Sequence, residues 1–411
     1  MKLTRILIII FLLSSPAYMM GGGIYLRLLG ASSLAMGNTG TGLALHASSV
    51  YQNPGAMAFL NPRLTLELGS SFQRPATTYL ENPPSTALAD MDTLTFTPLY
   101  AYAVARPIAS GKLTLGMGVN SPYGGGSLWP DEWSGQFISQ EFNLESLFIH
   151  PSFAFKVNDR LGLGLTISLG AVTLFNKRAI NIDGRKESRS SVRFSGQGAT
   201  AGLSVGAYYR VDSKLSLGLN LRSPMEVIIT DGIATFEVPP SLTDNFERQI
   251  FTTSFTLPGE INVGVGYYPE ERLLLTADLN IVFWSSWDSL VFNLSDPKPE
   301  IASFPARNWQ NTTNLRAGFE YALSEDIRMR GGAYYEQSPV PSGFVSPELP
   351  DANRIGITGG ASIRVIRRLY ADLTYTYEYT GERQGVLSAA NFAGTYETTV
   401  YAFMIGLGYE F

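Results

Sequence analysis

A histidine two residues before a serine, in His150-Pro151-Ser152, is the part of this sequence that comes nearest to enzyme chemistry. A serine becomes an acyl nucleophile when a neighbouring base accepts its proton. Apolar residues alternate around the pair, at Leu147, Ile149, Phe153 and Phe155. This period of two predicts a strand that turns both polar side chains away from its apolar face. The only other histidine is His46, and there is no cysteine. We therefore expect no enzyme, no metal site and no cofactor.

The last residues of the chain form a strand pattern that runs to the terminal carboxylate. One face carries Phe411, Tyr409, Leu407, Ile405, Phe403 and Tyr401, and the other carries Glu410, Gly408, Gly406, Met404, Ala402 and Val400. Such a strand needs an apolar medium on one side and a permissive interior on the other. A soluble sheet also alternates, but a strand that keeps its register up to a terminal aromatic residue resembles the last strand of bacterial outer-membrane barrels. The resemblance implies that Tyr409 and Phe411 belong to a signal for the barrel assembly machinery.

Two further segments repeat this alternation. Leu369, Ala371, Leu373, Tyr375, Tyr377 and Tyr379 alternate with polar residues, and so do Leu273, Leu275, Ala277, Leu279, Ile281 and Phe283. We expect these odd-numbered sets to face lipid. A soluble sandwich would not place Asp372 and Glu378 at core positions opposite an aromatic face.

The N-terminus has the features of a secretory signal peptide. Lys2 and Arg5 precede the apolar run 6–13, and Ser15-Pro16-Ala17 supplies small residues for cleavage near Ala17. The run is too short for a membrane helix, which needs about 20 residues. The alternative is a buried N-terminal strand.

The composition fits a secreted barrel. The 411 residues include 41 Gly, 21 Tyr and 23 Phe, and 16% are charged, as alternating strands with aromatic girdles require. The absence of cysteine excludes disulfides and an acylated N-terminal cysteine. Without Lys2 and Arg5, 28 basic residues stand against 35 acidic ones, a net charge of −7. Nucleic acid is therefore not an expected partner.

Short and long connections alternate along the chain. Six short polar turns are predicted at 107–112, 158–160, 212–214, 269–272, 324–326 and 366–368. Seven longer connections are predicted at 74–90, 121–143, 176–190, 231–249, 293–306, 338–352 and 380–395. Thirteen connections join fourteen strands, with both ends on the short-turn side. Outer-membrane barrels place short turns in the periplasm, so we expect an all-β, 14-stranded antiparallel transmembrane barrel with both termini periplasmic.

Residues 18–62 lie between the predicted signal peptide and the first strand at Arg63. The range 30–60 is rich in Gly, Ala and Ser, which suits short turns packed against protein. A fourteen-stranded lumen is too wide for side chains alone to fill. We therefore expect a signal peptide over 1–17, a hatch or plug inside the lumen over 18–62, and the barrel over 63–411. The alternative for the second segment is a disordered periplasmic tail.

Six motifs occur in the order in which a known family has them. The N-terminal segment contributes Gly30-Ala31-Ser32-Ser33-Leu34-Ala35-Met36-Gly37 and then Asn53-Pro54-Gly55, and the others are Asn120-Ser121-Pro122-Tyr123-Gly124 with Trp129-Pro130-Asp131-Glu132-Trp133-Ser134-Gly135, Trp284-Ser285-Ser286-Trp287, Gln337-Ser338-Pro339-Val340-Pro341 and Leu349-Pro350-Asp351-Ala352-Asn353-Arg354. Over essentially the whole mature chain, the sequence resembles the FadL-type outer-membrane transporters of long-chain fatty acids and other hydrophobic compounds. Gly55 departs from the usual Asn-Pro-Ala of the family hatch.

The resemblance implies a barrel plugged by its hatch, with a kink in the third strand that opens the wall sideways. Gly116, Gly118, Pro122 and Gly124 suit such a kink, because proline lacks a ladder donor and glycine tolerates bends. An ordinary strand end followed by a turn is the alternative. A lateral exit would let a hydrophobic molecule leave without full hydration.

Candidate substrate-binding residues are aromatic and basic. Trp129, Trp133 and Phe137 lie in a predicted outer loop, where they either pack together or contact a ligand. The family binds the head group with basic side chains, and the matching regions offer Lys177, Arg178 and Arg307. Each could equally be a loop charge facing lipopolysaccharide.

The expected function is the uptake of hydrophobic compounds, with long-chain fatty acids as the first candidate, by binding among the outer loops and lateral release. We expect a monomer in outer-membrane lipid and lipopolysaccharide. A general porin is the main alternative, and the expected hatch argues against it. A surface adhesion or receptor role for the loops is the other alternative.

Overall fold

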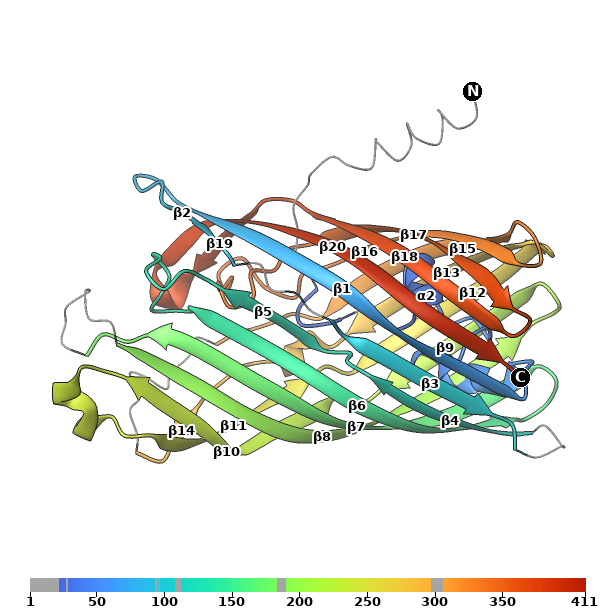
Figure 1. Ribbon diagram of the computed structural model, residues 1–411, viewed down its shortest axis with the longest axis horizontal. Helices are drawn as coiled ribbons and strands as arrows, with labels where there is room; N and C mark the ends of the chain where they lie inside the picture. The colour runs from blue at the N-terminus through green and yellow to red at the C-terminus, as the bar shows by residue number, and fades with distance from the viewer. Residues whose placement is uncertain are drawn as a thin grey trace, which may run out of the picture.

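Fourteen wall strands close into an antiparallel barrel (Figure 1). The computed structural model describes residues 22–26, 29–92, 95, 97–107, 112–182, 190–296 and 306–411. The wall consists of β1 (Leu64–Glu81), β3 (Leu99–Ala105), β4 (Leu113–Asn120), β6 (Glu141–Lys156), β7 (Leu161–Ala179), β8 (Ser191–Arg210), β9 (Leu215–Arg222) continued by β10 (Met225–Glu237), β11 (Gln249–Leu257) continued by β12 (Glu260–Glu270), β13 (Leu273–Val282), β15 (Thr312–Ala322), β16 (Ile327–Glu336), β17 (Arg354–Ile366), β18 (Leu369–Thr380) and β20 (Phe392–Glu410). Each strand pairs with the next, and β20 returns to β1 from Thr65 opposite Glu410 to Glu81 opposite Gly394. The predicted fold class is confirmed.

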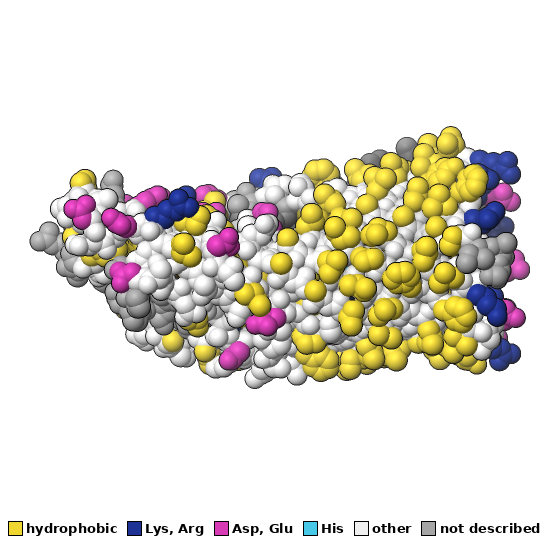
Figure 2. All heavy atoms as spheres, turned by 90° about the horizontal axis from the view of Figure 1, so that it is seen from below, with side chains coloured by type: hydrophobic (Ala, Val, Ile, Leu, Met, Phe, Trp, Pro, Cys, Tyr) yellow, Lys and Arg dark blue, Asp and Glu magenta, His cyan; other side chains and the backbone are white. Residues whose placement is uncertain are grey.

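The outer surface of the barrel carries a broad apolar band. In β20, Phe403 is 52% exposed and the next residue, Met404, is fully buried. Asp372 in β18 is likewise turned inward, whereas Leu373 is 58% exposed. The predicted alternation of these strands is therefore confirmed. Figure 2 shows the apolar side chains as a broad band that ends at a rim of charged residues. The other end of the molecule is mostly polar.

The short turns lie at one end of the barrel, near the C-terminus, and the long connections lie at the other (Figure 1). We call these the turn end and the loop end. Five predicted turns join consecutive wall strands as expected, and the sixth lies in part outside the described residues.

The predicted boundaries of several long connections were wrong. β1 continues to Glu81, seven residues beyond the predicted start of its loop at Arg74, and forms a hairpin with β2 (Leu88–Asp90). The loop end also contains β5 (Gly124–Leu128), β14 (Asn293–Leu294), β19 (Arg383–Leu387) and the 3-10 helices η2 (Pro240–Asn245), η3 (Trp284–Ser286) and η4 (Ser388–Ala390). These segments lie beyond the apolar band, where apolar and polar residues no longer alternate regularly, and their sequences therefore resemble loops.

The segment before β1 packs inside the barrel. It contains α2 (Ala31–Ala35), α3 (Ser49–Gln52) and the 3-10 helix η1 (Pro54–Phe59), and every residue of α2 and η1 is buried. α2 contacts β16, β17, β18 and β20, whereas η1 contacts β4, β6, β7 and β8 on the opposite side. The segment therefore bridges the lumen. Among the described residues, no helix combines the length and the hydropathy of a membrane span.

Two polar side chains fix this inner segment to the wall. Asp278 Oδ2 in β13 accepts hydrogen bonds from the backbone N–H groups of Gly40 and Thr41, both at 2.9 Å. Asn53 Nδ2 donates to the carbonyl oxygens of Thr41 at 2.7 Å and Ala207 at 3.0 Å. Such bonds give a buried turn the partners that it would otherwise lack.

Gly55 lies where the segment comes closest to the wall. A Cβ atom at this position would be 2.7 Å from the carbonyl oxygen of Gly206 and 2.8 Å from that of Gly162. Real side chains do not reach such distances to backbone atoms. The departure from alanine in the Asn-Pro-Gly triplet therefore matches a close approach between η1, β7 and β8.

Candidate functional site

His150 and Ser152, the two residues considered as a possible base and nucleophile, do not contact each other through their side chains. His150 is fully buried on the inner face of β6, with Nε2 2.8 Å from Asn120 Oδ1 and Nδ1 3.0 Å from Ser168 Oγ. The Ser152 hydroxyl instead lies 2.7 Å from that of Thr166. Both imidazole nitrogens have other partners, so these groups link β4, β6 and β7. In the described part of the chain, no group of three or more His, Asp or Glu residues is placed to hold a metal ion.

The barrel wall is interrupted where β4 gives way to β5. β4 pairs with β6 up to Asn120 opposite Phe148, and β5 resumes at Gly124 opposite Glu145. The chain thus advances four residues while β6 advances three, which is a bulge and bends the strand. β3 accompanies β4 only as far as Tyr100 opposite Asn120. Beyond that point, none of the described strands pairs with the second edge of β5.

The facing edge of β1 has a matching interruption. β1 pairs with β3 as far as Ser70 and with β2 only from Thr78 onward. Between these two paired stretches, the edge of β1 takes part in isolated backbone hydrogen bonds, from Ser71 N to Pro98 O and from Met91 N to Thr77 O. The barrel thus lacks a strand ladder between β1 and β5 in the part that the structure describes.

Residues 24–26 pair with residues 122–124, at the start of the free edge of β5. Tyr25 forms an antiparallel bridge with Tyr123, Leu26 N donates to Pro122 O and Gly124 N donates to Ile24 O, each bond at 2.9 Å. The inner segment therefore covers the start of this edge in place of a wall strand. An uncovered edge would expose unpaired backbone groups.

Tyr25 is also held from inside the barrel. Arg222 Nη1 donates to the hydroxyl oxygens of Tyr25 at 2.9 Å and Tyr51 at 2.8 Å, and it is paired with Glu260 Oε1 at 2.9 Å. The Arg222 guanidinium lies 3.8 Å from the centre of the Tyr51 ring. Burial raises the pKa of Tyr51 to about 12, so its hydroxyl keeps its proton at neutral pH. This network ties the start of the inner segment to β9 and β12.

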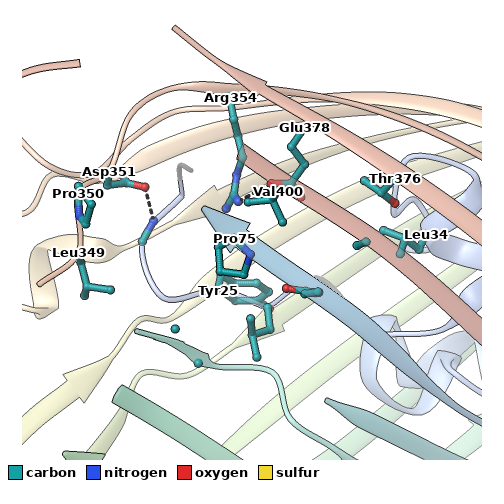
Figure 3. Close-up of a pocket in the computed structure, with 16 residues that line it drawn as sticks. Tyr25, Leu34, Pro75, Leu349, Pro350, Asp351, Arg354, Thr376, Glu378 and Val400 are labelled. Carbon is teal, nitrogen blue, oxygen red and sulfur yellow. Dashed lines mark hydrogen bonds and ion pairs between the residues drawn. The ribbon is translucent and has the colours of Figure 1, made fainter. Parts of the chain in front are cut away.

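A cavity of about 80 Å³ lies inside the wall at the interruption (Figure 3). Its apolar lining includes Tyr25, Pro75 of β1, Leu349 and Val400 of β20. The main cation in the lining is Arg354 of β17, whose Nε is 3.0 Å from Glu336 Oε2 and whose Nη1 is 3.0 Å from Glu378 Oε2. The opposite wall is formed by the backbone of β5, where glycines keep the space open. This combination of apolar walls and a few placed polar groups is typical of a small-molecule site.

The predicted kink residues divide into two groups. Pro122 lies within the interruption, and Gly124 is the first residue of β5 and lines the cavity. Gly116 and Gly118 lie in the regularly paired part of β4, where added Cβ atoms would be 2.8 and 3.0 Å from Val50 side-chain carbons. These two glycines thus accommodate the inner segment. Their part in a lateral exit stays a prediction.

The predicted loop aromatics pack against one another. Trp129 and Trp133 are both buried and stacked, with ring centroids 4.4 Å apart, and Tyr79 of β1 meets Trp133 edge-on at 5.4 Å. The indole nitrogens donate to the carbonyl oxygens of Pro347 and Ser139, both at 2.9 Å. Phe137 is half-buried nearby in sequence. The geometry favours loop packing over ligand contact, and none of the three lines the cavity.

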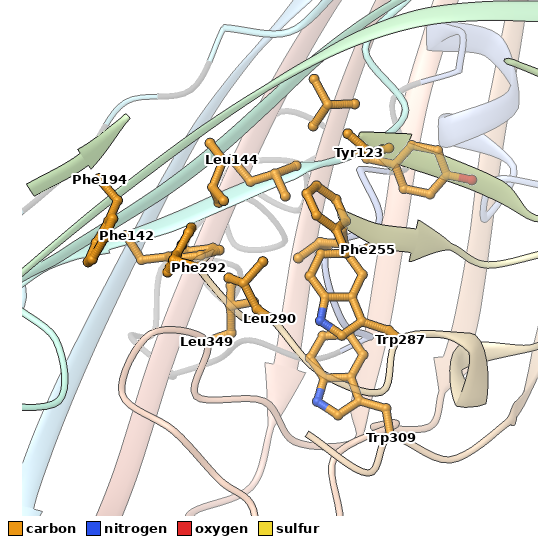
Figure 4. Packing of buried hydrophobic residues seen from close by; sticks show 14 of the residues in the cluster. Tyr123, Phe142, Leu144, Phe194, Phe255, Trp287, Leu290, Phe292, Trp309 and Leu349 are labelled. Carbon is orange, nitrogen blue, oxygen red and sulfur yellow. The ribbon is translucent and has the colours of Figure 1, made fainter. Parts of the chain in front are cut away.

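The three predicted cations have different surroundings. Arg307 Nη2 lies 2.9 Å from Glu348 Oε2, and Arg178 in β7 is buried. Lys177 instead forms an ion pair with the exposed Asp131 at 3.1 Å. Figure 4 shows the aromatic surroundings of this region, where Trp287 and Trp309 stack with centroids 5.4 Å apart.

Sequence reasoning missed Glu348, Arg354 and Tyr25. Arg354 belongs to the Pro-Asp-x-x-Arg motif, so its place in a motif was a usable signal. Glu348 is a single acid in a loop rich in proline, and no pattern connects it with Arg307, 41 positions earlier. Tyr25 lies beside the predicted signal peptide, where no strand was expected.

Comparison with known proteins gives a consistent result. Residues 12–411 match the family described as outer membrane protein transport protein (OMPP1/FadL/TodX). Outer membrane protein P1 of Haemophilus influenzae is 22% identical over 293 residues, which cover 65% of this chain and 62% of that protein. The fold of a Pseudomonas aeruginosa FadL homologue superposes with a TM-score of 0.82 at 18% identity, over 95% of this chain and 100% of the other. The Ralstonia pickettii toluene transporter TbuX superposes with a TM-score of 0.70 at 16% identity, over 93% and 98%.

Proposed function

We propose that this chain, which belongs to the outer membrane protein transport protein family of OMPP1, FadL and TodX, takes up hydrophobic small molecules across the outer membrane. The observation that carries this proposal is the apolar cavity beside the interruption between β1 and β5. A pore for water-soluble solutes would need an open lumen, and here residues 29–62 cross it.

The inner segment acts as the hatch in this proposal. The signal peptide would cover 1–17, which lie outside the described residues, the hatch would cover 18–62 and the barrel 63–411. The contacts of α2 and η1 with opposite sides of the wall support this division.

A hydrophobic molecule would enter among the loops, occupy the cavity and leave sideways beside β5. Each methylene group that passes into water costs about 0.8 kcal/mol, so an exit into lipid avoids a large barrier for a long chain. The cavity of about 80 Å³ is smaller than the roughly 150 Å³ apolar cavity known to bind benzene. Occupation therefore requires a lining residue such as Tyr25 or Leu349 to move aside.

Long-chain fatty acids and uncharged hydrocarbons are the two candidate substrate classes. A fatty-acid carboxylate that enters such a pocket needs a cation, because burial without one is unfavourable. The predicted cations Lys177 and Arg307 both contact carboxylates of the protein itself. One of the structural neighbours is named as a toluene transporter, which supports the hydrocarbon class.

The test is to fill the cavity from a small side chain. Ala402 of β20 lines the cavity and is 5% exposed, so Ala402→Phe should abolish uptake of radiolabelled dodecane by cells that express the protein. Ala101 of β3 is exposed on the outer surface, and Ala101→Phe is the matched control that should leave uptake unchanged. Folding is checked in both by heat-modifiable migration. A folded Ala402→Phe barrel with normal dodecane uptake would show that the cavity is not on the route.

A further inference from the structure

Glu348 is clamped through both of its carboxylate oxygens. Oε2 is paired with Arg307 Nη2, and Oε1 accepts a hydrogen bond from Asn176 Nδ2, each at 2.9 Å. The Arg307 and Glu348 side chains are only 7% and 6% exposed. Its backbone oxygen also accepts a bond from Ser127 Oγ at 3.1 Å. Each carboxylate oxygen of Glu348 thus has a donor, and the bond from Arg307 is charge-assisted.

The surroundings of this pair exclude water. The Arg307 guanidinium carbon lies 5.8 Å from the Trp287 ring, 5.9 Å from Trp309 and 6.0 Å from Phe142. All three aromatic side chains are at most 4% exposed, and they belong with Leu349 to one buried cluster (Figure 4). In such a medium the attraction between opposite charges is stronger than in water, and an unpaired charge is unfavourable.

We propose that Glu348 is a specificity-determining residue, because it fills the anion-binding position that Arg307 and Asn176 form and thereby makes the uptake path select uncharged hydrophobic molecules over carboxylates. The inference rests on the function proposed above and adds its substrate class. An incoming fatty-acid carboxylate would have to displace Glu348. The displaced carboxylate belongs to the same chain, so its high effective concentration opposes the exchange. An uncharged molecule leaves the pair intact.

The position of Glu348 in the chain connects the pair to the cavity. The next three residues, Leu349, Pro350 and Asp351, line the cavity. Asp351 Oδ1 accepts a bond from Gly23 N at 3.3 Å, so the same stretch also touches the inner segment. Within the cavity, Arg354 already contacts the carboxylates of Glu336 and Glu378. Arg354 in the cavity lining and Arg307, whose partner immediately precedes that lining, are thus both neutralised by carboxylates of the protein.

The test compares two probes with the same carbon chain, dodecane and dodecanoate, in uptake by cells that express the full-length protein at neutral pH. The parent protein should take up dodecane at least about tenfold faster than dodecanoate, the equilibrium equivalent of one charge-assisted hydrogen bond. Glu348→Gln keeps the side-chain volume and frees the charge of Arg307. Dodecanoate uptake should then rise about tenfold, with dodecane uptake unchanged.

Two further variants identify the cause. In Arg307→Gln/Glu348→Gln the freed cation is gone, so dodecanoate uptake should fall back to the parent rate. Glu382→Gln removes an exposed acid at the loop end and controls for general repulsion of anions, so it should change neither probe. An equal gain in Glu382→Gln would assign the discrimination to surface charge and overturn the proposal.

If Glu348→Gln fails to fold, uptake of the two probes by the parent protein still tests the proposed role of Glu348. Dodecanoate uptake as fast as dodecane uptake would overturn the role of Glu348 while leaving the transport function intact. Uptake of neither probe above cells with an empty vector would overturn the transport function itself, and this inference with it.

Discussion

Single residues of the inner segment are fitted to the wall with little tolerance. Gly55 faces Gly206 and Gly162 at distances that a Cβ atom could not keep. Such closeness is possible because β7 and β8 also present glycines there. Gly381, by contrast, has no heavy atom within 4 Å of an added Cβ. The two positions form a matched pair for testing whether the fit seals the barrel.

We predict that Gly55→Val opens the barrel to ions, because the added side chain pushes η1 away from β7 and β8. Single-channel recordings on the purified protein in planar bilayers should show conductance several-fold above that of the parent. Gly381→Val should behave as the parent does. If Gly55→Val folds and stays closed, η1 is not part of the seal.

The candidate site was only partly predictable from individual residues. Arg178 and Arg307 were proposed from the family resemblance as cations that bind the head group of the substrate, because a buried carboxylate needs a cation. Glu348, the partner of Arg307 and Asn176, was not predicted, because contacts between residues 41 or 172 positions apart leave no periodic signal. For Trp129 and Trp133 the sequence left two options, packing against each other or contact with a ligand. The choice between them depends on three-dimensional packing.

At the scale of elements, the sequence predicted strands well and loop boundaries poorly. The period of two in β13, β18 and β20 follows from the contrast between an apolar exterior and a polar interior. Past the apolar band, both faces of β1 meet water or protein, and the contrast disappears. Arg74 to Glu81 therefore looked like a loop although its backbone stays paired with β20.

The last strand gives a prediction about assembly. Phe411 is 58% exposed, and its backbone closes the barrel through bonds with Leu64, in which Phe411 N donates to Leu64 O at 2.8 Å. Phe411→Ala keeps these bonds and removes only the terminal aromatic ring. We expect markedly less folded, heat-modifiable barrel in the outer-membrane fraction, because the ring belongs to the proposed assembly signal.

Phe403→Ala is the control for the loss of an aromatic ring. Phe403 lies on the same outward face of β20 with 52% exposure, but eight positions before the end. Its replacement should leave the folded amount near the parent level. Equal losses in both variants would assign the effect to surface hydrophobicity in place of a terminal signal.

For the whole molecule, the two ends of the barrel predict its orientation. The exposed η2 (Pro240–Asn245) lies at the loop end, and the turn at 212–214 lies at the turn end. We expect a protease site inserted in η2 to be cut on intact cells and one inserted at 212–214 to be protected. The opposite pattern would place the termini outside.

The bridged lumen predicts what happens when its filling is removed. Deletion of 30–60 should leave a barrel that folds but conducts ions continuously, since fourteen strands enclose more space than the wall side chains fill. Bilayer conductance and sensitivity of cells to large hydrophilic antibiotics measure this. A folded deletion variant that conducts no more than the parent would show that loops at one end are a sufficient seal.

The bridge between Tyr25 and Tyr123 gives a way to control passage by redox state. The bonds from Leu26 N to Pro122 O and from Gly124 N to Ile24 O flank it, which makes it the narrow type of antiparallel pair, with Cα atoms about 4.5 Å apart. That spacing suits a disulfide. Because the chain contains no cysteine, the variant Tyr25→Cys/Tyr123→Cys can form only one intramolecular disulfide, the one between these two positions. Oxidised cells should then exclude dodecane and reduced cells admit it, whereas Tyr25→Cys alone should respond to neither. If the disulfide forms and dodecane uptake is not slowed, molecules leave the barrel by another route.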